Sequence, residues 1–209
     1  MPPTVHLYAD TLAMRYGRRV LFRALSFEAA GGASLAVTGA NGSGKSTLLK
    51  ILAGVVTPVR GSVRLTLDGA EVPATERPRS VGLAGPYLGL YDGYSARETL
   101  AFLADARGLR AAPIIPLLDR VGLGTRADDR VGTFSSGMQQ RLRLATALLA
   151  APAVLLLDEP GATLDTEGRA LIRALVAEQQ AAGTLVIVAT NDPAEAALCD
   201  QTLVLSHFV

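Results

Sequence analysis

The sequence predicts an α/β fold whose core is a mostly parallel sheet, with an antiparallel β subdomain near the amino terminus and an inserted helical subdomain. Three observations predict this arrangement. Short apolar or β-branched runs alternate with helical patterns along much of the 209 residues. Residues 61–69 alternate apolar and polar side chains and end in an Asp-Gly turn. Between 95 and 151 the strand patterns vanish and helical spacing takes over.

The expected strands are short, and they differ in how deeply their patterns predict them to be buried. Residues 154–157 and 185–188 are continuous apolar runs, as in strands that are covered on both faces. Residues 61–69 instead resemble a half-exposed antiparallel strand that enters a hairpin. The expected strands are 20–27, 34–38, 62–67, 80–84, 154–157, 185–190 and 202–206.

Helical patterns are expected at 46–53, at 114–121 and directly after Ser135. Another helix begins at a capping box, in which Ser95 and Glu98 would each hydrogen-bond the other's backbone amide. These elements predict a single domain over 1–209: an α/β core with its β subdomain at 1–91 and 152–209, and a helical subdomain at 92–151.

Length and composition exclude several classes of protein. A chain of 209 residues corresponds to one domain or to one domain with an insert. A hydrophobic fraction of 49% with a net charge of +1 rules out intrinsic disorder. The sequence has no stripe of basic residues, so a nucleic-acid partner is not expected. The single cysteine, Cys199, can form neither an internal disulfide nor a zinc cage, which indicates a reducing compartment.

Targeting signals are not evident in the sequence. No segment reaches the roughly 18 uncharged apolar residues that a membrane-spanning helix needs. Residues 1–10 contain neither a basic n-region nor an apolar h-region, so no secretory signal is expected. We therefore expect a cytoplasmic protein.

The decisive motif is the segment 39–47, a full match to G-x-x-x-x-G-K-[ST] between an expected buried strand and an expected helix. Its glycines let backbone amides turn inward around phosphate oxygens, and the helix adds its positive amino end. Lys45 would pair with the β- and γ-phosphates, and Ser46 would ligate Mg²⁺. The alternative is a glycine-rich turn without a ligand. The expected ATP-binding residues of this loop are Gly39, Ala40, Asn41, Gly42, Ser43, Gly44, Lys45, Ser46 and Thr47.

Two carboxylates end the apolar run at 154–157. Asp158 is expected at the carboxyl edge of the sheet, where it would be the second protein partner of Mg²⁺. Glu159 follows and would orient or deprotonate the water that attacks the γ-phosphate. The alternative, two acids in a solvated turn, fits poorly with the preceding apolar run and the Pro-Gly turn that follows.

Taken together, these residues resemble the ATP-binding subunits, or nucleotide-binding domains, of ATP-binding-cassette (ABC) transporters, which are P-loop NTPases. Residues 134–138 match the family's signature, usually Leu-Ser-Gly-Gly-Gln, in a variant form, Phe-Ser-Ser-Gly-Met, at a similar spacing from Asp158. Ser135 resembles a helix N-cap that could help to hold an anion. The resemblance implies that the signature residues Ser135, Ser136, Gly137 and Met138 contact ATP bound to a second subunit.

Two other positions follow the family's order along the chain. Tyr16 resembles the aromatic residue that stacks on adenine, although an ordinary surface or strand tyrosine is the alternative. Asp165 resembles the loop residue that crosses the dimer interface, although an aspartate there is also a common helix cap.

The sequence departs from the family at two places. Asn191 stands where a switch histidine is usual. It can donate a hydrogen bond to a phosphate oxygen but cannot titrate, so we expect either slower hydrolysis or a larger share of the catalysis from Glu159. The expected catalytic residues are Glu159, Lys45 and Asn191. No glutamine occurs at 81–95, where the family usually has one near Mg²⁺; Pro86 or Tyr87 comes nearest. The apolar and aromatic side chains in 87–91 are expected either to form a docking patch for a membrane subunit or to pack between the core and the helical insert.

The resemblance implies a transport-coupled ATPase that binds ATP and Mg²⁺. Its partners would be a second ATPase subunit, in a head-to-tail homodimer or heterodimer, and an integral-membrane permease, with the chain peripheral on the inner face of the cell membrane. The short chain and the variant signature resemble small exporters of the haem-export or cytochrome c maturation type. The alternatives are an assembly or regulatory clamp without a permease, and a nucleotide-binding switch with little hydrolysis.

Overall fold

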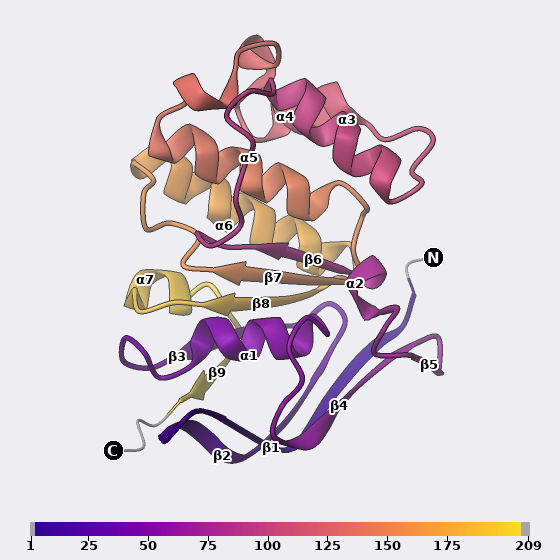
Figure 1. The fold of residues 1–209 in the computed structure, drawn as a ribbon, viewed down its shortest axis with the longest axis vertical. Helices are drawn as coiled ribbons and strands as arrows, with labels where there is room; N and C mark the ends of the chain where they lie inside the picture. The colour runs from indigo at the N-terminus through magenta and orange to yellow at the C-terminus, as the bar shows by residue number, and fades with distance from the viewer. Residues whose placement is uncertain (1–2, 206–209) are drawn as a thin grey trace.

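The computed structural model describes residues 3–205 and contains two β-sheets of different kinds (Figure 1). One is a five-stranded parallel sheet in the order β6-β7-β8-β3-β9, and the other is a four-stranded antiparallel sheet in the order β2-β1-β4-β5. The strands are β1 (Val5–Tyr16), β2 (Arg19–Ala30), β3 (Ser34–Thr38), β4 (Arg60–Leu67), β5 (Ala70–Val72), β6 (Val81–Ala84), β7 (Val154–Asp158), β8 (Leu185–Ala189) and β9 (Gln201–Val204). The predicted α/β fold class is confirmed.

Helices cover the parallel sheet and connect its strands. The α-helices are α1 (Lys45–Leu52), α2 (Arg77–Ser80), α3 (Ala96–Ala106), α4 (Ile114–Arg120), α5 (Ser136–Leu148), α6 (Thr166–Ala181) and α7 (Pro193–Ala196); two short 3-10 turns are η1 (Gly124–Arg126) and η2 (Val131–Thr133).

The parallel sheet separates two hydrophobic cores. Because side chains alternate across a strand, Leu155 and Leu157 of β7 pack into one core with the helices α3 to α6. Val154 and Leu156 point to the other face, where α1 and the antiparallel sheet bury the same apolar run. Burial on both faces explains why β7 and β8 are continuous apolar segments in the sequence.

The long strand β1 was not among the expected strands. Its side chains at Val5, Leu7 and Ala9 alternate inward, but the register shifts after Ala9, and the next buried residues are Leu12 and Met14. Such a bulge changes the phase of the alternation, so the strand lacks a regular period in the sequence. The short β5 was also missed, although the hairpin that joins it to β4 was expected.

The segment between β6 and β7 contains helices and turns but no strand within the described residues, and it forms the upper part of Figure 1. The capping box is present: the Ser95 amide donates to Glu98 Oε2 at 2.8 Å, and the Glu98 amide donates to Ser95 Oγ at 3.1 Å. α3, α4 and α5 meet in a core that includes Leu100, Leu118 and Leu142.

Most element boundaries differ from the expected ones by a few residues. β2 extends three residues beyond 27 to Ala30, and α1 begins at Lys45, with Gly44 as its N-cap. β9 ends at Val204, and Ser206, the last residue of the expected strand 202–206, lies outside the described residues.

Candidate functional site

The glycine-rich loop joins β3 to α1 and wraps over the amino end of that helix. Gly44 has φ +104, and a side chain there would approach Leu21 and Phe22 at 3.0 to 3.2 Å. Gly39 has φ +144, and a Cβ atom on it would lie 2.6 Å from the Leu205 carbonyl oxygen. Both backbone conformations are rare for residues with side chains, so the motif needs glycine at these positions.

Lys45 lies inside this loop and is only 6% exposed. Its Nζ donates to the Gly39 carbonyl oxygen at 3.0 Å and to Asn191 Oδ1 at 2.7 Å, and lies 3.5 Å from Glu159 Oε1. The ammonium group is thus held by neutral oxygens and one carboxylate at the amino end of α1, where positive charge accumulates. An anion that enters the loop meets the lysine and the helix end together.

Asn191 follows β8 and contacts the glycine-rich loop from the neighbouring strand. Its Nδ2 donates to Asn41 Oδ1, while its Oδ1 accepts from Lys45. The structure therefore places Asn191, the expected switch residue, against the glycine-rich loop, although the two segments are far apart in the sequence. The amide retains a donor that can point to a phosphate oxygen.

Asp158 is the last residue of β7 and is completely buried. Within the described part of the chain, neither of its carboxylate oxygens has a hydrogen-bond partner of ordinary geometry. Burial raises the pKa of this carboxyl, while the Ser46 hydroxyl and the charges of Lys45 and Lys50 oppose the rise. A buried carboxylate without partners, next to a hydroxyl, is a donor set that suits a hard cation such as Mg²⁺.

Glu159 sits at the sharp turn after β7 and has a left-handed backbone with φ +47. Its amide donates to the Ala189 carbonyl oxygen at 2.8 Å, which ties the turn to β8. Its Oε2 accepts from the backbone amide of Asn191 at 3.4 Å and lies 3.5 Å from Thr190 Oγ1. A non-glycine residue in this region is strained, and such strain is common at functional sites.

Lys45 and Glu159 line a cavity of about 410 Å³, together with Tyr16. Tyr16 is the final residue of β1 and is 55% exposed, so its ring is free to stack on a flat ligand. Arg19, which the sequence did not single out, borders the same cavity and donates to the Gly42 carbonyl oxygen at 3.0 Å. The other lining residues are Leu21, Asn41, Gly42, Gly44, Lys45, Ser46, Thr47 and Glu159.

The signature segment lies away from this cavity. Ser135 caps α5 as expected, and its Oγ accepts from the Met138 amide at 3.2 Å. Ser135 and Ser136 are exposed, and none of residues 135–138 lines the cavity around Lys45. The signature instead contacts the loop after β7, where Thr163 Oγ1 lies 3.5 Å from the Ser136 carbonyl oxygen.

Asp165 has the helix-capping geometry that was its alternative interpretation. Its Oδ1 accepts from the Gly168 amide at 2.8 Å at the start of α6 and lies 3.7 Å from Arg141 Nη2. The side chain is nevertheless 73% exposed, so it is accessible for contact with a second subunit.

The loop without the usual glutamine places Tyr87 near the buried carboxylate. The Lys50 ammonium lies 3.7 Å from the centre of the Tyr87 ring, and burial, with the charge of Asp158, raises the pKa of Tyr87. Farther along, Leu88, Leu90 and Tyr91 line an apolar groove of about 260 Å³ between the parallel-sheet core and α3.

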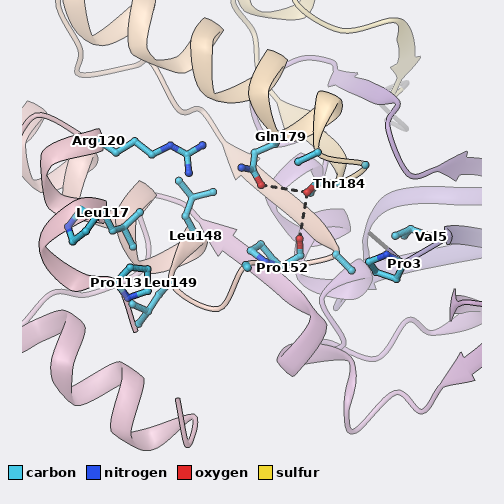
Figure 2. Close-up of a pocket in the computed structure, with 15 residues that line it drawn as sticks. Pro3, Val5, Pro113, Leu117, Arg120, Leu148, Leu149, Pro152, Gln179 and Thr184 are labelled. Carbon is cyan, nitrogen blue, oxygen red and sulfur yellow. Dashed lines mark hydrogen bonds between the residues drawn. The ribbon is translucent and has the colours of Figure 1, made fainter. Parts of the chain in front are cut away.

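A second cavity, of about 530 Å³, lies at the opposite edge of the sheet (Figure 2). Its apolar walls include Leu117 and Leu148, and the Thr184 hydroxyl lies within hydrogen-bond distance of Gln179 Oε1 and the Pro152 carbonyl oxygen. Pro152 and Thr184 precede β7 and β8, whereas Asp158 and Asn191 stand at or beyond the carboxyl ends of these strands. This cavity is therefore separate from the glycine-rich loop.

A family model described as "ABC transporter" matches residues 22–162, a segment that includes the glycine-rich loop, the signature and Glu159. The chain belongs to this family. It is an ATP-binding subunit of the ABC type and an ATPase. Among the described residues, no helix has both the length and the apolar character that a membrane crossing requires.

Relatives support the family assignment over most of the chain. The chain is 36% identical over 177 residues to a "Cytochrome c biogenesis ATP-binding export protein CcmA" of Rhodopseudomonas palustris (strain HaA2), covering 85% of this chain and 87% of the relative. It is 35% identical over 200 residues to a "Nod factor export ATP-binding protein I" of Burkholderia orbicola (strain AU 1054), covering 92% of this chain and 65% of that protein.

Solved structures agree with the fold. An "ATP binding subunit of ABC transporter" superposes with a TM-score of 0.82 at 29% identity, over 96% of this chain and 85% of that one. A "bacterial Atm1-family ABC exporter with ATP bound" also gives a TM-score of 0.82, at 24% identity, over 98% of this chain and 37% of the exporter. The second likeness bears on the fold alone.

Proposed function

We propose that this chain is the ATP-hydrolysing subunit of a membrane exporter and that it works as one of a pair of ATPase subunits bound to a permease. The observation that carries the proposal is the meeting of Lys45, Asp158, Glu159 and Asn191 at one edge of the parallel sheet. The names of the relatives, which describe ATP-binding proteins of export systems, support the direction of transport.

In this proposal each residue acts on one part of ATP. Tyr16 stacks on the adenine ring, and the amides of residues 39–47 with the Lys45 ammonium bind the phosphates. Glu159 accepts the proton of the attacking water, and its existing contacts with Thr190 and the Asn191 amide orient the carboxylate for that step. Asn191 donates a hydrogen bond to a γ-phosphate oxygen in place of its present bond to Asn41.

Ser46 and Asp158 are the residues that would hold Mg²⁺. The buried, unpartnered carboxylate and the adjacent hydroxyl offer oxygen ligands of the kind that this ion binds. When bound, the ion supplies charge neutralisation at the β- and γ-phosphates.

A second subunit completes the site in this scheme. Ser135, Ser136, Gly137 and Met138 are at the start of α5, away from the cavity around Lys45 of the same chain. The helix end that Ser135 caps would bind the γ-phosphate of ATP held by the partner, and the exposed Asp165 lies on the loop that packs against the signature.

The permease would bind in the apolar groove beside α3. Tyr91 and Phe102 border this groove, are 63% and 47% exposed, and stack edge to face with ring centres 6.3 Å apart. Exposed aromatic side chains around an apolar groove are typical of protein interfaces. Binding there would hold the chain on the inner face of the cell membrane.

We propose haem export or cytochrome c biogenesis as the process served, on the likeness to the CcmA relatives.

The proposal is tested by purifying tagged Glu159→Gln protein from membranes with Mg-ATP, alongside the same protein carrying Tyr91→Asp and Phe102→Asp. We expect a polytopic membrane protein to copurify with Glu159→Gln and to be lost from the groove variant. Copurification of water-soluble proteins alone would favour the assembly-clamp function. Steady-state phosphate release at saturating ATP separates an ATPase from a nucleotide-binding switch.

A further inference from the structure

A buried carboxyl group lies directly behind the turn that carries Glu159. Glu195 belongs to α7, is only 7% exposed, and its Oε2 has no hydrogen-bond partner within residues 3–205. Its Oε1 packs against the backbone of Gly161 and occupies the space that a side chain there would need. No step of ATP binding described above uses this group, yet a buried carboxyl is costly to retain.

The hydroxyl of Thr190 lies between Glu195 and Glu159. Thr190 is fully buried at the end of β8, and its Oγ1 accepts from the Asp192 amide at 3.0 Å. The same oxygen lies 3.5 Å from Glu159 Oε2, and Thr190 is near enough to the Glu195 carboxyl to oppose the rise in its pKa. A hydroxyl has one proton, so it can donate to only one of the two carboxyl groups at a time.

The charges around Glu195 favour its neutral form. Burial raises the pKa of Glu195, and the charges of Asp192 and Glu159 act in the same direction, while hydrogen bonds with Thr190 and Gly161 oppose it. Arg169 does not neutralise this carboxyl, because its guanidinium pairs with Asp192 at 2.8 Å. A neutral Glu195 can donate its own proton to Thr190 Oγ1, which leaves the threonine proton for Glu159.

The backbone that this contact supports is strained. Glu159 has φ +47, so its side-chain direction depends on neighbours that hold the turn. Glu195 Oε1 lies against Gly161, two residues after Glu159. Thr190, which influences the Glu195 carboxyl, has its hydroxyl oxygen 3.5 Å from the Glu159 carboxylate.

We propose that Glu195 is a positioning residue for ATP hydrolysis, which holds the Glu159 carboxylate in place through the Thr190 hydroxyl and the Gly161 backbone. The inference rests on the role of Glu159 in the proposed function.

Two substitutions of similar volume separate hydrogen bonding from packing. Glu195→Gln keeps a donor and an acceptor, whereas Glu195→Met keeps the volume alone. We expect Glu195→Met to lower kcat about tenfold, the loss of one hydrogen bond to a charged group, with the Kd for ATP unchanged. We expect Glu195→Gln to retain kcat within about threefold. Glu178→Met, at the far end of α6, is the matched control and should leave both constants unchanged.

A double-mutant cycle tests the route through the hydroxyl. Thr190→Val should lower kcat by a similar factor, Thr190→Ser should not, and Glu195→Met should cause no further loss in the Thr190→Val background. Equal kcat values for Glu195→Met and Glu195→Gln would overturn the inference, as would additive losses or a parallel weakening of the Kd. If Glu195→Met does not fold, the Thr190→Val protein decides the question alone, and wild-type turnover by it would equally overturn the inference.

Glu159→Gln, measured in parallel, separates the two ideas. Wild-type turnover by this variant would remove the proposed role of Glu159 itself. An inactive Glu159→Gln beside a fully active Glu195→Met would remove only the role of Glu195.

Discussion

Replacing Asp158 by asparagine should stabilise the nucleotide-free protein while it abolishes ATP hydrolysis. Neither oxygen of this buried carboxyl has a hydrogen-bond partner of ordinary geometry in the described structure, and burial raises its pKa against the opposing effect of the Ser46 hydroxyl. A raised pKa in the folded state means that ionisation opposes folding above that pKa, and that the penalty disappears below the pKa of the unfolded chain. The neutral amide of asparagine avoids the cost of the buried charge.

The expected gain follows from the cost of an unsatisfied buried group, about 1–2 kcal/mol once the amide's own unpaired atoms are allowed for. For a domain of this size that corresponds to a rise in Tm of about 2–8 °C. The measurement is a thermal melt in a chelator without nucleotide, at about pH 8 and at a series of lower pH values. The difference should shrink as the pH falls through the raised pKa, because the aspartate then takes up its proton.

Asp128→Asn is the control, because Asp128 is exposed and its ion pair with Arg97 contributes at most about 1 kcal/mol. A melting temperature of Asp158→Asn at or below that of the unmodified protein near pH 8 would refute the reasoning. It would mean that the carboxylate is satisfied in solution by groups that the described contacts do not include.

Substitutions at three other positions probe nucleotide binding and hydrolysis. Tyr16→Ala should weaken ATP binding about tenfold and Tyr16→Phe should not, because stacking needs the ring alone; equilibrium titration with ATP checks both. Asn191→Ala should lower kcat about tenfold by removing a donor to the γ-phosphate, measured as phosphate release. Ser135→Asp should keep the cap of α5 and an unchanged Tm, while its charge repels the partner's ATP and prevents the ATP-dependent dimer of Glu159→Gln protein on size exclusion. A dimer in that last experiment would contradict the proposed contact.

The features that the sequence predicted are those whose physical cause is local. The phosphate loop needs glycine where the backbone turns at Gly39 and Gly44, and a lysine at a fixed offset, so its motif is visible in nine residues. β7 and β8 are buried on both faces and are therefore visible as apolar runs. β1 was not predicted, because the bulge near Thr11 changes the phase of its apolar–polar alternation.

The features that the sequence could not predict depend on which strands become neighbours. Lys45 and Asn191 are hydrogen-bonded across 146 positions of the chain, and no local pattern records that contact. Thr190 and Glu195 look like an ordinary strand end and an ordinary helix residue until β8 is paired with β7. Arg19 gives no signal either, since its bond to Gly42 requires the antiparallel sheet to lie over the loop.

The order of the parallel sheet explains why one edge gathers the chemistry and why one chain is insufficient in the proposed scheme. β7, β8 and β3 are adjacent, so the loops that follow them bring Glu159, Asn191 and Lys45 within a few ångströms of one another. The capped end of α5 belongs to the helical segment and does not border that cavity. In the proposed scheme this exposed helix end binds the phosphate of ATP held by another subunit, because it is separate from its own chain's glycine-rich loop.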